Sequence, residues 1–327
     1  MAVVLNSRML PIGAVLLLTA YAHAGDESTA TPVSVVFTPS GDAQSAPHGK
    51  GNVYAPEILI ENGHFRMWFG GQGRDGHDRI QLAESQDGRS WQQLGVVLED
   101  PTANHVNDPS VVKRGDTYFM YYSRAGTEVH DEIALATSGD GIHWSQRGVV
   151  LRPSAPGNWD SLLVGRPSVL VEGERFRMWY DGRKDLPAGA PASGAPVAEV
   201  STRAVGYAES RDGIHWSRPQ TSPVFGENAG GVHVVRIGQG YAMVYESSEG
   251  TRCATSTDGL VWKPKGVLAP RSGGDEDRFG HVTPFLLVGS NDAVSLFVGG
   301  ARNGRWDENI ILRIDLNKAQ GDSLREQ

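Results

Sequence analysis

The side chains best suited to chemistry are titratable residues at similar places in a repeated pattern. Read across five repeat units, they are Glu57, Asp108, Arg166, His233 and His281. A carboxylate can act as general acid, base or nucleophile, and a histidine can donate a proton or ligate an ion. A guanidinium does not donate a proton at neutral pH, but its planar fork binds carboxylate and sulfate groups. The set predicts acid–base chemistry beside a place for an anionic group.

Two further carboxylates, Asp181 and Glu246, end strand-like runs where other units have Gly or Ser. They either reach the same centre or make solvent contacts at its rim. The histidines also have an ordinary interpretation, since a buried, hydrogen-bonded histidine is the commoner finding. For Arg166 the ordinary interpretation is a salt bridge to Asp108 that only holds the centre together.

A repeated hairpin motif must position these residues. The sequence S-x-D-G-x-x-W occurs four times, at residues 85–91, 138–144, 210–216 and 256–262. An Asp-Gly pair between two strand-like runs predicts a tight hairpin, and the Trp offers a large apolar face for a neighbouring unit. We interpret the four motif aspartates as structural, because identical positions around a ring cannot converge on one substrate. Cys253 aligns with apolar residues of other units and is interpreted as a core residue.

A second hairpin precedes each motif and completes a four-stranded unit. In three units, a Pro in the first strand lies 12 residues before an aromatic residue in the second strand. The pairs are Pro56 and Trp68, Pro109 and Tyr121, and Pro167 and Trp179. A fourth unit starts at Gly231. A fifth starts near His281 and lacks the Trp motif, and Val33 to Phe37 is expected to supply its outer strand. The repeat predicts an all-β fold, a five-bladed β-propeller. A two-sheet β-sandwich would not require four equivalent Trp residues.

Composition excludes several classes of protein. The chain has 327 residues, of which 41 are Gly, and a formal charge of -8. Such an acidic balance lacks the basic stripe that nucleic-acid binding needs, so nucleic acid is not an expected partner. A single Cys excludes an intrachain disulfide framework. No Gly-rich phosphate loop, Ser-His-Asp order or zinc signature is present.

The N-terminus is typical of a secretory signal. Arg8 precedes a twelve-residue apolar stretch, and residues 22–24 form a small-x-small cleavage site, so residues 1–24 are expected to be removed. A membrane anchor is the alternative, but the stretch is shorter than the ~20 residues of a span. The expected mature protein is one domain, residues 25–327, periplasmic or secreted and without a membrane span. Residues 184–203 interrupt the repeat as an inserted loop rich in Pro, Ala and Gly, expected to be exposed and to overhang the centre.

These motifs resemble the five-bladed propeller superfamily of glycoside hydrolases, which includes families 43, 32, 68, 117 and 130. The resemblance covers almost the whole expected mature chain. It is carried by the Trp hairpins, by the runs at residues 54–57 and 107–109, which are similar to the Trp-Ala-Pro-Asp and Asp-Pro runs of family 43, and by strands ending Met-Trp-Phe-Gly-Gly and Met-Trp-Tyr-Asp-Gly. Where a family 43 enzyme is expected to show an acidic Glu, this chain has Arg166.

The resemblance implies a central funnel with two working carboxyl groups. The expected catalytic residues are Asp108, Glu57, Asp181 and Glu246. Asp108 is expected to be kept ionised by Arg166, and Glu57 either faces the funnel or points into its blade. The expected substrate-binding residues are Arg166, His233, His281, Tyr54, Asn107 and Arg183.

The leading functional hypothesis is an exported glycoside hydrolase that acts on an oligo- or polysaccharide. The alternative is a non-catalytic carbohydrate-binding propeller that kept the funnel and lost the acid. A third possibility, phosphorolysis as in family 130, needs a basic pocket, suggested only by Arg166, Arg183 and Arg302. No cofactor or metal is expected, although a structural calcium ion in the central channel is left open. The protein is expected to be a monomer with a carbohydrate partner.

Overall fold

A computed structural model describes most of the protein after its N-terminal region. The described residues are 33–39, 52–73, 75–103, 105–126, 130–187, 197–198, 201–289, 292–304 and 307–326, with only the backbone at 187, 197 and 198. Residues Thr31–Gln327 belong to one compact unit. The predicted signal peptide, residues 1–24, and the middle of the predicted inserted loop lie outside the described residues.

The strands fall into consecutive antiparallel sets. Set 1 consists of β2 (Val53–Glu61), β3 (His64–Gln72), β4 (Asp78–Ser85) and β5 (Trp91–Leu98). Set 2 consists of β6 (His105–Arg114), β7 (Thr117–Ala125), β8 (Asp131–Ser138) and β9 (Ser145–Leu151). Set 3 consists of β10 (Leu163–Glu172), β11 (Arg175–Arg183) and β14 (Ala204–Ser210). The short strands β12 (Leu186–Pro187) and β13 (Val197–Ala198) pair in parallel at the two ends of the insertion.

The remaining strands form one larger sheet that divides naturally in two. Set 4 consists of β15 (His233–Ile237), β16 (Gly240–Ser247), β17 (Gly250–Ser256) and β18 (Lys263–Pro270). Set 5 consists of β19 (Gly280–Val288), β20 (Val294–Ala301), β21 (Asn309–Asp315) and β1 (Val33–Phe37). The strand pairing between the two sets consists of one residue pair, Ser247 with His281. The helix α1 (Lys318–Ser323) follows β21.

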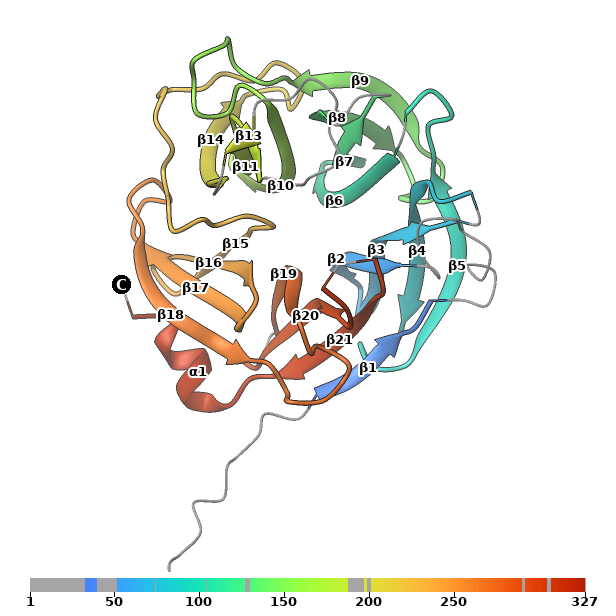
Figure 1. The fold of residues 1–327 in the computed structure, drawn as a ribbon. Coiled ribbons are helices and arrows are strands. Elements are labelled where there is room, and N and C mark those ends of the chain that lie inside the picture. The colour runs from blue at the N-terminus through green and yellow to red at the C-terminus, as the bar shows by residue number, and fades with distance from the viewer. Residues whose placement is uncertain are drawn as a thin grey trace, which may run out of the picture. The chain divides into compact units, whose positions relative to one another are not determined.

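The first strands of the sets meet around a common centre (Figure 1). In order, β2 contacts β6, β6 contacts β10, β10 contacts β15, β15 contacts β19, and β19 contacts β2. Such a closed ring of radially packed sheets is a β-propeller, so the predicted fold class is confirmed. The pairing of β1 with β21 confirms the expected outer strand of the last set. The blade number stays a prediction, and the grouping into five sets supports it.

The Trp hairpins have one geometry in all four copies. In the first, the Ser85 hydroxyl accepts the Gly88 amide at 2.9 Å, while the Asp87 carboxylate accepts the amides of Arg89 and Ser90 at 2.8 and 2.7 Å. The same bonds recur at Asp140, Asp212 and Asp258. These aspartates therefore shape turns, as predicted.

Each hairpin Trp packs on an aromatic residue of the preceding set. The ring pairs are Trp144 with Trp68, Trp216 with Tyr121, Trp262 with Trp179, and Trp91 with Phe297, all edge-to-face at centroid distances of 6.3, 5.3, 6.4 and 6.1 Å. The prediction that the four Trp residues hold equivalent places against neighbouring units is confirmed. Because each contact joins two sets, the motif that closes a hairpin also joins that set to its neighbour.

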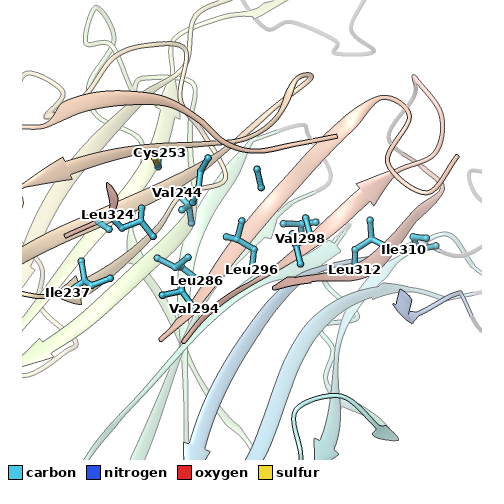
Figure 2. Close-up of a cluster of buried hydrophobic side chains, with 14 residues drawn as sticks. Ile237, Val244, Cys253, Leu286, Val294, Leu296, Val298, Ile310, Leu312 and Leu324 are labelled. Atoms are coloured by element: carbon cyan, nitrogen blue, oxygen red, sulfur yellow. The ribbon is translucent and has the colours of Figure 1, made fainter. Parts of the chain in front are cut away.

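Apolar residues between the sheets complete the core. Figure 2 shows the cluster between sets 4 and 5, where Val244 and Cys253 face Leu286, Leu296 and Leu312. Cys253 is 2% exposed, which confirms its predicted place in the core.

Trp262→Ala should lower the free energy of unfolding by about 3–5 kcal/mol, because it removes a buried ring and leaves a cavity between two sets. Chemical denaturation would measure the change. The matched control is Val261→Ala, since its side chain is 75% exposed and should contribute less than about 0.5 kcal/mol. Equal losses in the two variants would show that the hairpin Trp does not join the sets.

Candidate functional site

Each set places one residue with left-handed backbone at the centre, and in four of the five sets this residue is not Gly. Ala55, Asp108, Arg166 and Thr283 all precede a Pro and have φ between 42 and 52°, and Gly231 has φ 57° at the corresponding place. Left-handed backbone is costly for residues other than Gly, and here it accompanies irregular strand pairing in four of the inner strands. All five residues line a narrow cavity of about 30 Å³ at the centre.

This ring corrects the predicted alignment of the units. Glu57, His233 and His281 do not occupy the positions of Asp108 and Arg166, which belong instead to Ala55, Gly231 and Thr283. The physical reason is the bulge at each X-Pro step, which turns the residue before Pro inward. Unit 4 has Val232 in place of Pro, so the sequence offered no anchor for its register.

Glu57 and His233 join neighbouring inner strands. The Glu57 carboxyl accepts the Val111 amide at 3.0 Å, and His233 Nδ1 accepts the Leu286 amide at 3.0 Å. Ser110 and Ser168 make the same bond to the next set, so the position is structural in four of the five sets. In set 5 it is held by the apolar Phe285. Burial raises the pKa of Glu57 to about 8 and lowers the pKa of His233 to about 3. His233 is therefore neutral and accepts a bond rather than donating a proton.

His281 is fully buried and has partners on both ring nitrogens. Its Nδ1 lies 2.9 Å from the Thr251 hydroxyl and its Nε2 lies 3.0 Å from Asp277. His281 stands where sets 4 and 5 meet and belongs to the lining of the main cavity described below. Among the described residues, no group of three or more His, Cys, Asp or Glu is arranged to hold a metal ion.

Arg166 is the cation at the centre. Its Nη1 lies 3.0 Å from Asp181 Oδ2, and its Nε lies 3.9 Å from Asp108 Oδ2. Its backbone amide donates to the Ser123 hydroxyl at 2.8 Å. Asp181 is completely buried and pairs in register with Gly165, where a side chain would crowd Ser123. Asp181 thus lies behind Arg166, and not at the rim.

A second guanidinium, Arg203, binds the fourth predicted carboxylate. Arg203 Nη1 contacts Glu246 Oε1 and lies 3.8 Å from Asp181 Oδ2. The other Glu246 oxygen accepts the Thr283 amide at 3.2 Å. Gly231 allows this approach, because a Cβ there would lie 2.6 Å from the carboxylate. Arg203, the last residue of the predicted insertion, was not predicted as a site residue from the sequence. The one signal for it was its position where the repeat resumes after the insertion.

The pKa values of Glu246 and Asp108 are shifted in opposite directions. Burial opposes ionisation of Glu246, yet Arg203 and Arg166 outweigh it and lower the pKa of Glu246 to about 2. Burial raises the pKa of Asp108 to about 7; Arg166 offsets this in part, while the nearby Asp131 and Asp181 add to it. The expectation that Arg166 keeps Asp108 ionised is therefore wrong. Arg166 lies closer to Asp181 than to Asp108.

A polar layer supports Asp108 from set 2 and set 1. Asn107 donates to the Tyr54 hydroxyl at 2.6 Å, which fixes the tyrosine on the cavity wall. His105 Nε2 lies 3.0 Å from Asp131 Oδ1. Burial alone would lower the pKa of His105, but Asp131 raises it to about 9, so the pair is ionic at neutral pH. Neither His105 nor Asp131 was singled out from the sequence.

A cavity of about 770 Å³ opens beside this cluster, a volume within the usual range of ligand sites. Its charged lining residues are Arg166, Arg183, Arg203, Arg252, Glu227 and Glu246, and His281 also lines it. Of the predicted site residues, Tyr54, Arg166, Arg183, Glu246 and His281 line it, whereas Asp108, Glu57 and His233 line the smaller cavity that shares Arg166. Ser201 and Arg203 bring the end of the insertion into the wall.

The amino-acid sequence is similar to those of several known proteins. No family model matches the sequence. Uncharacterized protein Rv1502 of Mycobacterium tuberculosis is 30% identical over 259 residues, which cover 71% of this chain and 81% of that protein. A 1,2-beta-oligomannan phosphorylase of Thermoanaerobacter sp. is 31% identical over 112 residues, or 34% of this chain and 35% of that protein.

Solved structures show the same fold at lower sequence identity. A complex of BT0996 with RGII has a TM-score of 0.70 at 18% identity, covering 87% of the present protein and 91% of the BT0996 structure. Zg3597, a family 117 glycoside hydrolase of the marine bacterium Zobellia galactanivorans, has a TM-score of 0.65 at 15% identity, covering 87% and 90%. The protein therefore has the β-propeller fold of these structures. Its one described helix, α1, is too short to cross a membrane.

Asp108→Asn should stabilise the protein at pH 8. The folded pKa of about 7 lies above the unfolded value near ~3.9, so folding becomes less favourable as pH rises from about 4 to about 7. Removing the ionisable group should raise the free energy of unfolding at pH 8 by about 2–4 kcal/mol and change it little at pH 4. Urea denaturation at both pH values measures this. Asp140→Asn, at an exposed hairpin, should show no such gain; a loss for Asp108→Asn at pH 8 would mean that its charge stabilises the centre.

Proposed function

We propose that this chain, which belongs to the same family as the mycobacterial protein Rv1502, is an exported glycoside hydrolase that acts on an oligo- or polysaccharide in the 770 Å³ cavity. The propeller fold is compatible with this activity and does not establish it. The observation that carries the proposal is the pair of carboxyl groups with oppositely shifted pKa values, Glu246 in contact with Arg203 and Asp108 at 3.9 Å from Arg166.

The two carboxyl groups divide the chemistry by their protonation. With its pKa near 7, Asp108 keeps a proton in a large fraction of molecules at neutral pH. It lines the smaller cavity, which shares Arg166 with the 770 Å³ cavity, and from there it can deliver the proton to the leaving oxygen of a sugar that reaches the shared wall. Glu246 is ionised and lines the cavity, so it can act as base or nucleophile at the anomeric carbon. When the surroundings of two carboxyl groups raise the pKa of one and lower that of the other, the first can serve as the acid and the second as the base. Asp181 is a positioning residue, because its contacts are with Arg166 and Arg203.

A non-catalytic carbohydrate-binding propeller is the second candidate. One observation favours it: Arg203 contacts the Glu246 carboxylate directly and so competes with any electrophile for it. In that case the cavity would bind a sugar, and the carboxyl groups would only shape its wall.

Asp108→Asn and Glu246→Gln should each lower kcat on a cleavable glycan by about 10²–10⁴, because general acid–base groups contribute that much. The wild type is first screened on aryl glycosides and on plant, algal and bacterial glycans. Asp140→Asn is the control and should retain wild-type kcat, and circular dichroism checks that each variant folds. Absence of turnover on every glycan, with Asp108→Asn altering only sugar affinity, would favour the binding protein.

The pH profile of kcat/KM, which reports ionisations of the free enzyme, should fall on its alkaline side near pH 7, where Asp108 loses its proton. No acidic limb is expected above about pH 4, because Glu246 stays ionised with a pKa of about 2. Steady-state rates between about pH 4 and pH 9 measure this. A profile with the opposite slope, rising through pH 7, would show that the acid has been misassigned.

A further inference from the structure

The cavity wall contains four arginines, and three of them have a carboxylate partner. Arg166 pairs with Asp181 at 3.0 Å, and Arg252 pairs with Glu249 at 2.7 Å. Arg203 contacts Glu246. Arg183, at the end of β11, has no carboxylate within salt-bridge distance anywhere in the described part of the protein, and its buried Nε has no hydrogen-bond partner there.

The surroundings of Arg183 leave its charge uncompensated. Burial lowers the pKa of this guanidinium, and the positive charges of Arg166 and Arg203 act in the same direction. Asp181 and Glu246 offset part of the effect, but each is held by another arginine. Arg183 is half-buried, and its buried Nε has no hydrogen-bond partner among the described residues. Such a cation is unfavourable without a close counter-charge, and a bound anion would supply one.

We propose that the cavity recognises a sugar that carries a singly charged oxyanion, a uronate carboxylate or a sulfate ester, and that Arg183 is its partner. The inference rests on the proposed carbohydrate substrate and adds its chemical class. It also differs from the sequence expectation, which assigned this task to Arg166: the fork of Arg166 already binds Asp181.

The charge of the ligand follows from the same neighbours. A guanidinium binds two oxygens of a carboxylate or sulfate through its planar fork. A doubly charged phosphate would bring a second negative charge toward Asp181 and Glu246, both of which act electrostatically on Arg183. Arg183 is one cation that is unpaired within the described structure, so a ligand group with a single negative charge matches it best.

Matched ligands that differ only in charge test this proposal. Calorimetry would measure binding of glucuronate and galacturonate oligosaccharides and of their methyl esters, and of a sulfated oligosaccharide and its desulfated form. At least one charged ligand should bind about 10–100-fold more tightly than its uncharged counterpart, as expected for a charge-assisted hydrogen bond. Which pair shows the preference distinguishes carboxylate from sulfate.

Arg183→Gln should abolish this preference while leaving the weaker binding of the uncharged ligand unchanged. The control is Arg175→Gln, on the same strand, whose side chain is 63% exposed and should keep the preference. The melting temperature of Arg183→Gln should equal or exceed that of the wild type, because no ion pair is lost. A lower melting temperature would indicate a structural role instead.

The outcomes separate this inference from the proposed function. Equal affinity for charged and uncharged ligands, or a preference that survives Arg183→Gln, overturns the inference alone. Competition by inorganic phosphate at millimolar concentration, without preference between the sugar pairs, overturns it in favour of a free-anion site. Binding of no sugar in either form contradicts the carbohydrate substrate itself.

Discussion

The ion pair between Arg166 and Asp181 is the interaction on which the centre of this protein depends. Asp181 is fully buried, and a carboxylate in that position needs a close cation. Arg166 supplies it from a left-handed backbone, with φ 47°. Gly165, the register partner of Asp181, avoids a clash with Ser123, whose hydroxyl accepts the Arg166 amide. The ion pair with Asp181 therefore offsets the cost of the left-handed backbone at Arg166. Comparable strain recurs around the ring, so the propeller geometry itself maintains it.

This ion pair explains why the pKa values of the other two carboxyl groups, Asp108 and Glu246, differ. Arg166 is committed to Asp181, so Asp108, at 3.9 Å, receives too little positive charge to overcome its burial. Glu246 is in direct contact with Arg203, which lies 3.8 Å from Asp181, and Glu246 remains ionised. Asp108 and Glu246 therefore differ in protonation because an arginine contacts Glu246 directly, whereas the arginine nearest Asp108 is paired with Asp181.

Local sequence signals predicted the fold well, because each works within one hairpin or one unit. The Ser, Asp, Gly and Trp of the motif bond within a few residues of one another, and β1 could be assigned to set 5 by counting strands. The site was harder to predict. The pKa of Asp108 depends on Asp131 and Asp181, from other strands, and the partner of Glu246 comes from an insertion. Where Pro was absent, at Val232, the register was lost, and a chemically attractive His233 was aligned in place of Gly231.

The pairing of β1 with β21 has a consequence for how the molecule reaches its native state. Val33 lies opposite Ile314, so the strand synthesised first completes a sheet whose other strands are synthesised last. Closing so long a loop carries a large entropic cost, and contacts of such sequence separation slow folding. Until β1 arrives, the backbone of β21 presents an open sheet edge that can pair with a second molecule. The ring is therefore most exposed to aggregation at the end of synthesis, when nearly all of its other sheets can already have formed.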